Sequence, residues 1–490
     1  MEWYIRQREP ITKEPRNLMI YKEEIEAKAK EFEIHEANVE RDYVFGWLIF
    51  GIFTTSNLKD EIFLKGGNAL RKGYFANTRY SSDLDFGIPG DINPEALLSE
   101  LNKVCDFIQE KAGVVFVKEN NTVKEKFLAS EAPIPGLKVY DARVYFKDFY
   151  GKSDHFNIKI SMDITRFDKV ILPIQEVDLI HPYSDTSEVK CRIRCMKLEE
   201  IIATKLKCLL QRQHAPDLFD YAYSIKLLGG NLNKEEVVKT FVKKTIFGRN
   251  PHVLKNILHQ TPLEYFRGCW DKTIVCSKNF LLGIEEAITL FLSDLENLFS
   301  IYPDNGYTQF AYFGPDLRVP IMKAGREQTL LKVRYKGADR IVEPYSLKYL
   351  QRKDGTQREY LYVYNCSGGN SAPGIRSFVV EGVQSIENTE DKFDPRNPIE
   401  LCKAGELPEN PYLFDPNRPT PAPRTRRTLS FPRVRRSSVR RSFGPKYIYQ
   451  CSFCGRKFTK TTYNSTLREH KDKNGYRCGG RRGFYIDTKY

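Results

Sequence analysis

The sequence predicts an α+β protein of several domains, and three observations carry this prediction. Short apolar runs alternate with helical segments in the first part of the 490-residue chain, as in a mixed α/β core. A helical half follows, with apolar residues at helical spacing within residues 197–299. Residues 308–391 are then rich in β-branched and aromatic residues between turn-forming glycines, which indicates a small β domain. The apolar runs of the first part lie at residues 61–64, 83–88, 138–146 and 156–164.

The charge of the chain is concentrated at one end. Residues 416–490 hold 20 Lys and Arg against 3 Asp and Glu, which gives this tail a charge of +17. The rest of the chain carries −3, and the whole chain therefore carries +14. Pro, Ser, Thr and Arg dominate residues 411–445, which predicts a linker that buries too little apolar surface to fold alone. Such a tail favours a polyanionic partner, although solubilising and targeting tails have similar compositions.

The sequence also bears on the compartment. No apolar run approaches the ~20 residues that a membrane-spanning helix needs, and the first residues show no signal-peptide pattern. The 11 cysteines are scattered without a dense framework, which fits a reducing environment. We therefore expect a cytoplasmic protein without a membrane partner.

A glycine pair after a strand-like run is the first candidate site. Because glycine lacks a β-carbon, the backbone of residues 64–71 can approach a triphosphate closely, and a helix beginning there presents free N–H groups to the anion. We expect this segment and the polar residues before the next strand to bind the nucleotide. The expected nucleotide-binding residues are Lys65, Gly66, Gly67, Asn68, Arg79 and Ser82.

Three carboxylates form the second candidate site. Asp83 and Asp85 lie two residues apart on a strand, so both side chains project from one face and attract a hard cation such as Mg²⁺ or Mn²⁺. Asp163 is the candidate for a third metal ligand, because it interrupts an apolar strand where a lone ionised carboxylate is costly. Asp154, in a turn-like segment, is the weaker rival. An Asp-x-Asp pair alone is more often a solvated turn, so the prediction rests on the ordered set of motifs.

The chain resembles the AbiEii/AbiGii nucleotidyltransferase toxins, a group that includes the MenT toxins, over about residues 42–299. The resemblance is carried by segments 65–71, 82–86 and 198–207 with Arg212, Asp217, Leu218 and Asp220. It implies a polymerase-β-like fold and transfer of NMP from an NTP, in several relatives to the 3′ end of tRNA. It also implies a place in toxin–antitoxin or phage-exclusion systems.

The same resemblance assigns catalytic roles to Lys205 and Asp217 on the helical half. Lys205 would neutralise triphosphate charge, and Asp217 would accept a proton or orient that lysine. A structural ion pair between helices is the alternative for both. Two positions depart from the family pattern, since Asn68 stands where Thr is common and Pro216 replaces the usual Arg before the aspartate.

The β-rich region resembles a WYL domain, a small SH3-like barrel of bacterial regulators and defence proteins, over about residues 329–393. The tripeptide that names the domain reads Glu359-Tyr360-Leu361, so its leading Trp is absent. Tyr360 is a candidate to stack on a base, and Arg340 and Arg376 are candidates to bind phosphate. A place in the core of the barrel is the alternative for the tyrosine.

The final segment has the spacing of a zinc site. Cys451 and Cys454 are followed after fifteen residues by His470 and after seven more by Cys478. The first half resembles a C2H2 zinc finger whose helix would carry Leu467 and His470, with a longer loop and Cys as the last ligand. We expect Zn²⁺ to supply the folding energy of this module, with unrelated thiols in a disordered tail as the alternative.

The linker before the zinc site carries a run of arginines, and no acidic residue occurs between Asp415 and Glu469, which predicts sequence-tolerant and salt-sensitive binding of nucleic acid. The expected contacts are Arg426, Arg427, Arg435, Arg436, Arg440 and Arg441.

These observations divide the chain into four parts and suggest one function. The parts are a nucleotidyltransferase domain at 1–300, a WYL-like domain at 301–395, a disordered Pro/Arg-rich linker at 396–447 and a zinc-finger-like module at 448–490. We expect a toxin or phage-defence enzyme that uses an NTP, acts on tRNA or other RNA, and meets a cognate antitoxin or a phage-derived trigger. The alternatives are a nucleic-acid-binding regulator or sensor with a non-catalytic core, and NMP transfer to a protein hydroxyl.

Overall fold

The computed structural model describes most of the chain. The described residues are 20–127, 138–149, 157–166, 170–248, 250–302, 311–351, 356–369, 372–396, 399, 401, 446–451, 454–462, 464–471 and 477–489. Several expected site residues lie outside these ranges, and the structure gives no account of them. They are Asp154 and the linker arginines Arg426, Arg427, Arg435, Arg436, Arg440 and Arg441.

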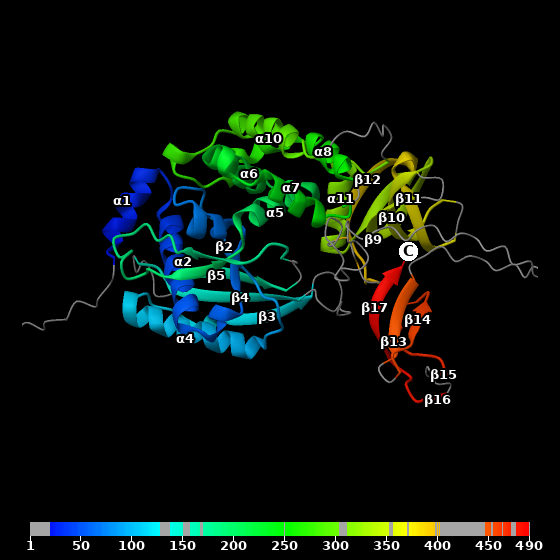
Figure 1. Cartoon of the computed structure of the whole chain (residues 1–490), viewed down its shortest axis with the longest axis horizontal. Coiled ribbons are helices and arrows are strands. Elements are labelled where there is room, and N and C mark those ends of the chain that lie inside the picture. Colours follow the sequence, from blue (N-terminus) through cyan, green and yellow to red (C-terminus); the bar gives the residue numbers. More distant parts are fainter. Residues whose placement is uncertain are drawn as a thin grey trace, which may run out of the picture.

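A seven-stranded mixed sheet forms the first unit (Figure 1). Its strands are β1 (Phe63–Lys65), β2 (Asp83–Gly87), β3 (Thr122–Phe127), β4 (Lys138–Lys147), β5 (Asn157–Thr165), β6 (Gln175–Asp178) and β7 (Arg192–Cys195). The order is β3-β4-β5-β2-β1-β7-β6, with β2 parallel to β5, β1 parallel to β7 and the other neighbours antiparallel. Each apolar run expected to be a strand overlaps one of these strands.

The central strands of this sheet have one apolar face and one polar face. Leu84 and Phe86 are fully buried, and the ring of Phe86 lies 6.5 Å from that of Phe53 on helix α2. Helix α4 contributes to the same core. Because side chains alternate along a strand, Asp83 and Asp85 project from the opposite face. The bounds of the helices near the sheet are α1 (Lys22–Phe32), α2 (Glu36–Thr55) and α4 (Pro94–Ala112).

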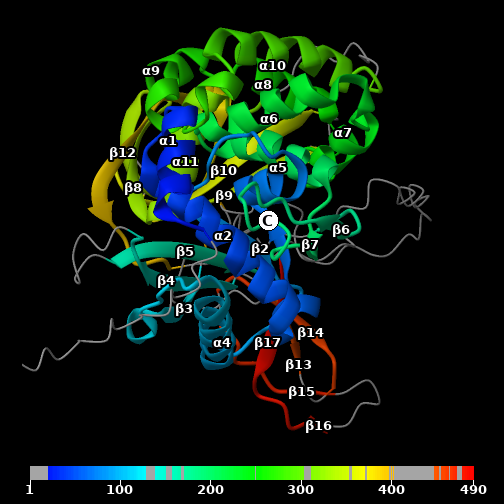
Figure 2. The same ribbon diagram turned by 90° about the vertical axis from the view of Figure 1, so that its left-hand side faces the viewer.

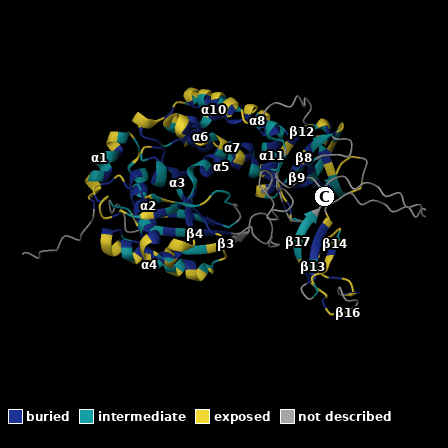
Figure 3. Ribbon diagram, viewed as in Figure 1, coloured by how far each residue is buried: buried dark blue, intermediate teal, exposed yellow. Residues whose placement is uncertain are grey.

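The predicted helical half follows the sheet in sequence. Its helices are α5 (Leu198–Gln211), α6 (Ala215–Leu228), α7 (Lys234–Lys243), α8 (Pro251–His259), α9 (Leu263–Thr273) and α10 (Ile284–Leu298). In both views these helices lie on one side of the sheet and α4 lies on the other (Figures 1 and 2). Exposed residues are concentrated on the outer surfaces of α4 and α10, whereas the central strands are mainly buried or half-buried (Figure 3).

A five-stranded antiparallel sheet forms the β domain. Its elements are α11 (Pro315–Glu327), β8 (Thr329–Tyr335), β9 (Ala338–Gln351), β10 (Gln357–Ser367), β11 (Gly374–Val379) and β12 (Val383–Lys392). The order is β11-β10-β9-β8-β12, and the described residues of β11 and β12 do not pair with each other. The expectation of a closed SH3-like barrel was therefore wrong. The apolar face of this open sheet is covered by α11, so the sheet need not curl onto itself to bury it.

The β domain packs against the helical half through α11, which contacts α5. Arg318 on α11 and Glu359 on β10 form a buried ion pair with N–O distances of 2.5 and 2.6 Å. The Arg318 guanidinium also lies 5.2 Å from the ring centre of Phe247, which follows α7. Phe247 in turn lies 5.2 Å from Tyr349 of β9. The two units therefore share a packed boundary.

The C-terminal module is built from short strands around its own small core. The strands are β13 (Lys446–Cys451), β14 (Lys457–Lys460), β15 (His470–Lys471), β16 (Arg477–Cys478) and β17 (Gly483–Lys489). His470 lies on a strand that pairs with Cys478, and none of the described residues of this module is helical. The expected finger helix was therefore wrong. Elsewhere, no described helix combines the length and apolarity that crossing a bilayer requires.

Replacing Glu359 by Ala should destabilise the β domain by about 3–5 kcal/mol, because it leaves the buried Arg318 guanidinium unpaired. The tryptophans of the chain lie outside the β domain, so their fluorescence would not report its unfolding directly. Pulse proteolysis in a urea series measures the loss of stability instead. The double variant Arg318→Met with Glu359→Leu is the control and should recover most of the loss. Equal destabilisation of the single and double variants would contradict the ion-pair explanation.

Candidate active site and zinc centre

A left-handed glycine brings the turn after β1 against the carboxylates of β2. Gly66 opens the short helix α3 (Gly66–Ala69) with a φ of +71°. A β-carbon at Gly66 would lie 2.1 Å from Oδ2 of Asp85, so both the backbone angle and the available space require glycine. A β-carbon at Gly67 would lie 2.8 Å from the guanidinium of Arg79. The predicted glycine pair thus lies directly beside the predicted carboxylates.

Strand register places Asp163 beside Asp85. The parallel strands β2 and β5 pair Asp85 with Asp163 and Asp83 with Ser161. From the other side, β1 pairs Lys65 with Asp85. Residues that pair directly on neighbouring strands share a face and lie on backbones about 4.8 Å apart. The structure therefore brings the three predicted carboxylates together on the polar face of the sheet.

Asp83 is held by polar groups on both sides of the turn. Ser81 donates a hydrogen bond to Oδ1 of Asp83 at 3.2 Å, and Ser82 does so at 3.5 Å. The amide group of Asn68, a buried residue, donates to the backbone carbonyl of Asp83. Asn68 therefore connects the glycine turn to β2, which is a positioning role for a residue expected to bind nucleotide.

The carboxylates repel one another. Burial, together with the negative charges of Asp83 and Asp163, raises the pKa of Asp85 to about 6, although Lys65 and Lys205 act in the opposite direction. A divalent cation would relieve this repulsion, and three carboxylates are a donor set that Mg²⁺ and Mn²⁺ accept. The chemistry of these donors, rather than a measured ligand geometry, thus fits the metal that the sequence predicts.

A chain of five alternating charges, four of them buried, lies next to the carboxylates. Arg79 donates two hydrogen bonds of 2.7 Å to Asp220 on α6. Lys205 on α5 contacts Asp220 at 2.7 Å and Asp217 at 3.1 Å. Arg212 donates to Asp217 at 2.8 and 3.1 Å. Arg79 and Lys205 are therefore engaged in ion pairs that join the segment before β2 to the helical half.

This network keeps its members charged. Burial alone would lower the pKa of Lys205, but Asp220 and Asp217 hold it above the usual range. Burial alone would raise the pKa of Asp217, yet Lys205, His214 and Arg212 hold it well below its usual range. The positive charge of Lys205 also acts on Asp85, so the ion pair between helices and a role at the carboxylates are compatible.

Pro216 does not disturb the position of this aspartate. Helix α6 begins at Ala215, and Pro216 stands in its first turn, where a missing N–H leaves no helical hydrogen bond unmade. Asp217 follows at once and is fully buried against Lys205.

Residues 47–267 match the family model described as nucleotidyl transferase AbiEii toxin, type IV TA system. The matched region runs from α2 to α9 and contains all the carboxylates and cations described above, but it is less than half of the chain. For this region the predicted resemblance is confirmed. No curated protein matches the chain.

A solved structure with similarity to the chain is that of MenT4, a nucleotidyltransferase toxin from Mycobacterium tuberculosis H37Rv. The alignment covers 57% of this chain and 99% of MenT4 at 16% sequence identity, with a TM-score of 0.34. At that score the superposition supports no conclusion about shape or mechanism, so no residue role is taken from it.

The AbiEii-type region contains two polar residues on its sheet that the sequence analysis missed. Strand β4 pairs Asp141 with Asp163 and Arg143 with Ser161, which extends the polar face by one strand. Asp141 is buried and forms an ion pair of 3.1 Å with Arg143. The signal was present in the sequence, since residues 141 and 143 are charged positions in the interior of a strand that is otherwise apolar between its two terminal lysines. Only the strand order, which the sequence does not give, makes them neighbours of the carboxylates.

The three expected ligand contacts of the β domain lie on β9, β10 and β11. The guanidinium of Arg340 donates to the carbonyl of Gly368 at 3.4 Å and lies 6.0 Å from the ring centre of Phe378. Arg376 donates to two carbonyl oxygens of its own turn at 2.8 and 2.7 Å. Tyr360 is half-buried on β10. The two arginines are thus held at the turn between β10 and β11, while Tyr360 is not part of the buried core.

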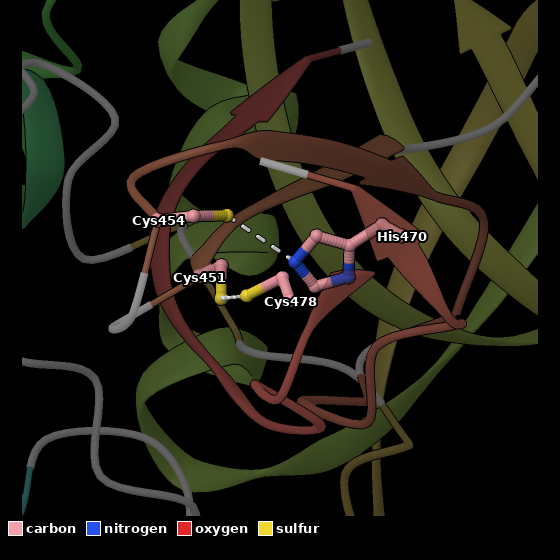
Figure 4. Close-up of side chains that lie close together, drawn as sticks. All are labelled: Cys451, Cys454, His470 and Cys478. Atoms are coloured by element: carbon pink, nitrogen blue, oxygen red, sulfur yellow. Dashed lines mark hydrogen bonds between the residues drawn. The ribbon is translucent and has the colours of Figure 1, made fainter. Parts of the chain in front are cut away.

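The predicted zinc ligands converge in the C-terminal module (Figure 4). The ligand atoms of Cys451, Cys454, His470 and Cys478 all lie within 4.8 Å of one another. Sγ of Cys451 lies 3.7 Å from Sγ of Cys478, and Sγ of Cys454 lies 3.3 Å from Nε2 of His470. Tetrahedral zinc with Zn–S bonds of about 2.3 Å separates two sulfurs by roughly 3.8 Å. The four residues therefore fit one Zn²⁺ ion, and Cys478 belongs to the set despite the long gap before it.

The turns around this centre have the form of zinc knuckles. Gly455 has a φ of +71°, and its N–H donates to the carbonyl of Cys451. The N–H of Gly480 donates to Sγ of Cys478 at 3.4 Å. The N–H of Gly480 therefore stabilises the thiolate of Cys478, which is the form that binds zinc, while the N–H of Gly455 fixes the turn after Cys451.

Replacing Asp85 by Asn should stabilise the metal-free protein at pH 7. A carboxyl whose pKa rises from 3.8 unfolded to about 6 folded favours the fold fully below about pH 4 and loses that contribution as the pH rises through 6. The variant should therefore unfold roughly 2–4 °C higher than the parent at pH 7 in a chelator, with no difference near pH 4. Thermal unfolding followed by tryptophan fluorescence measures this.

The matched control for this prediction is Asp271→Asn, because Asp271 is an exposed aspartate on α9. Magnesium should raise the unfolding temperature of the parent and of the control more than that of Asp85→Asn. Identical responses of all three proteins to pH and magnesium would contradict the proposed repulsion.

Replacing Cys478 by Ser should remove zinc from the protein. The parent should hold about one zinc per chain after dialysis against a mild chelator, since structural sites bind with roughly 10–16 kcal/mol, and the variant should hold almost none. Elemental analysis measures the ratio. Cys366→Ser, which changes a cysteine of the β domain outside the cluster, is the control and should keep its zinc.

Proposed function

We propose that the chain is a metal-dependent nucleotidyltransferase toxin that transfers NMP from an NTP to RNA, with the 3′ acceptor end of tRNA as the expected target. The observation that carries the proposal is the register of Asp85 with Asp163, two residues from Asp83 and against the turn at Gly66. The match of residues 47–267 to a family described as nucleotidyltransferase toxins supports the reaction class.

Asp83, Asp85 and Asp163 would hold Mg²⁺ or Mn²⁺. When bound, such ions polarise phosphoryl oxygens and neutralise the charge that develops on the leaving pyrophosphate. In the transfer itself, a hydroxyl oxygen of the acceptor would form a bond to the α-phosphorus of the NTP, the bond from that phosphorus to the oxygen bridging to the β-phosphate would break and release pyrophosphate, and the hydroxyl proton would pass to solvent.

The chain's own residues would position the substrates. Because Gly66 lacks a β-carbon, its turn packs directly against the carboxylate of Asp85, so a phosphate bound by the backbone of the turn would lie beside the carboxylates. Lys65, paired with Asp85 across the strands, and Lys205 bring positive charge to the same place. The guanidinium of Arg79 is already bonded to Asp220, so Arg79 would act indirectly. It would hold the segment before β2 against helix α6.

The basic tail, the zinc module and the β domain would bind the acceptor. The strongly basic composition of residues 416–490 suits a polyanion such as RNA. Zinc bound by the cysteines and His470 would hold the terminal module in shape. Arg340, Tyr360 and Arg376 would give the β domain a second contact with a nucleotide ligand.

The proposed setting is a toxin–antitoxin or phage-defence system. The description of the matched family names a type IV system, in which an antitoxin would counter the toxin. We propose that a cognate antitoxin or a phage-derived trigger controls the activity, and that the protein works in the cytoplasm, where tRNA and NTPs are found.

An assay with each α-labelled NTP, magnesium or manganese, total RNA and total protein tests this function. Label should enter RNA of tRNA size, and Asp163→Asn should lower the rate roughly 100-fold or more, because it removes transition-state charge stabilisation. Asp271→Asn, outside the carboxylate cluster, should transfer at the parent's rate. Label in protein would redirect the proposal to a protein hydroxyl, and no transfer by the parent to either acceptor would leave only a binding or sensing role.

A further inference from the structure

The sheet of the C-terminal module has a filled face and an open face. On the filled face, Phe458, Tyr449 and Tyr485 are neighbours across the three strands and pack into the core around the zinc ligands. On the open face, Gln450 at the centre pairs with Lys457 on one side and Phe484 on the other. The order β14-β13-β17 thus sets a lysine, an amide and a phenylalanine in one row.

Phe484 is unusually exposed for its size. The residue is 53% exposed, against 39% for Phe280, and it lies on strand β17 rather than in a loop. Gln450, between Phe484 and Lys457, donates a 3.0 Å hydrogen bond from its amide to the carbonyl of Gly455. An exposed ring on a sheet that also carries cations is the kind of surface on which nucleic-acid bases stack.

The surroundings of this row are strongly basic. Residues 446–490 hold 11 Lys and Arg against 3 Asp and Glu, a net charge of +8. Arg482 precedes Phe484 by two residues and therefore lies on the same side of the extended chain, where it is exposed. Glu469 is already paired with Arg477 and Arg481 at 2.6 and 3.1 Å, so it does not oppose an anion. Asp487 is the other acidic residue among those described in the module; it pairs with the buried Ile448 on the same face as Gln450, and it is half-buried.

The chain before this module points to the same partner. The arginine-rich linker ends directly before Lys446, the first residue of β13, so the two basic segments are continuous in the sequence. Phosphates would meet Lys457 and Arg482, and a base would meet the ring between them. Stacking on one face of a ring needs a base that is free of its neighbours, which a duplex does not offer.

We propose that Phe484, with Lys457 and Arg482, forms a stacking site for an unpaired base, so that the zinc-bound module binds single-stranded nucleic acid in preference to a duplex. The inference rests on the proposed role of this module in binding the acceptor. The module would select nucleic acid with unpaired bases, such as a protruding 3′ end.

Fluorescence anisotropy of the full-length, zinc-loaded protein tests this without NTP or magnesium, so the result does not depend on catalysis. The probes are labelled oligouridine and oligothymidine of about 12 nucleotides, a site size typical of single-strand binders, and a duplex RNA of the same length. Phe484→Ala should weaken binding of the single strands roughly 5–100-fold, the loss of one base stack, and leave duplex binding unchanged. Phe484→Trp should bind the single strands at least as tightly as the parent.

Phe280→Ala is the matched control, since Phe280 is a 39%-exposed phenylalanine of the helical half, and it should bind both probes like the parent. Lys457→Ala with Arg482→Ala should weaken both probes and reduce the dependence of affinity on salt. Zinc content, measured on every variant, verifies that the module is folded. The proposal is overturned if Phe484→Ala with full zinc binds single strands like the parent, if it loses single-strand and duplex binding equally, or if polyglutamate competes as well as oligouridine.

Different outcomes separate this inference from the proposed function. Loss of NMP transfer in Asp163→Asn with normal single-strand binding supports both. Stacking at Phe484 without transfer of NMP by the parent would leave the module a single-strand binder and sink only the catalytic proposal.

Discussion

The mutual repulsion of Asp83, Asp85 and Asp163 is the constraint on which the first unit depends. Three acids on neighbouring strand positions cost folding free energy unless positive charge is near, and the pKa of Asp85 reflects this cost. The chain answers with Lys65 on the adjacent strand and with Lys205 from the helical half. The helical half is therefore an electrostatic counterpart of the sheet as well as its cover. It leaves the acids incompletely neutralised, which is the state in which a divalent cation binds most favourably.

That counterpart is held in place by salt bridges that would be expensive to break. Asp220 and Asp217 alternate with Arg79, Lys205 and Arg212, and all but the last are buried. Removing one member would leave another charge unpaired in a buried place. The same helix α5 that carries Lys205 also contacts α11 of the β domain, where Arg318 pairs with Glu359. A change in how the β domain packs therefore has a direct physical route to the lysine beside the carboxylates.

The sequence was a good guide to residues and a poorer guide to their arrangement. Asp163 could be predicted because an acid inside an apolar strand needs a reason, and the register of β5 with β2 supplied that reason. Asp141 and Arg143 carry the same signal, yet they were missed because only strand order reveals that β4 borders β5. Local patterns report which face a residue takes, whereas the neighbour across the sheet depends on contacts far apart in the chain.

Two wrong expectations arose because a resemblance in sequence was extended to the backbone scaffold. The β domain was expected to close into a barrel by analogy, but α11 covers its apolar face and removes the need for closure. His470 was expected on a helix because the first half of the motif resembles a C2H2 finger, but its strand pairs with that of Cys478. In both cases the ligands or candidate contacts lie where the spacing suggested, while the scaffold differs. Metal-ligand chemistry fixes distances between side chains and leaves the backbone several ways to meet them.

Gly66 has a consequence for how such a gene changes over generations. Any other amino acid would place a β-carbon 2.1 Å from Oδ2 of Asp85 and would strain the left-handed backbone. Even the smallest missense change at this codon, to alanine, therefore disturbs the carboxylate strand, although the side chain that it replaces is a single hydrogen atom.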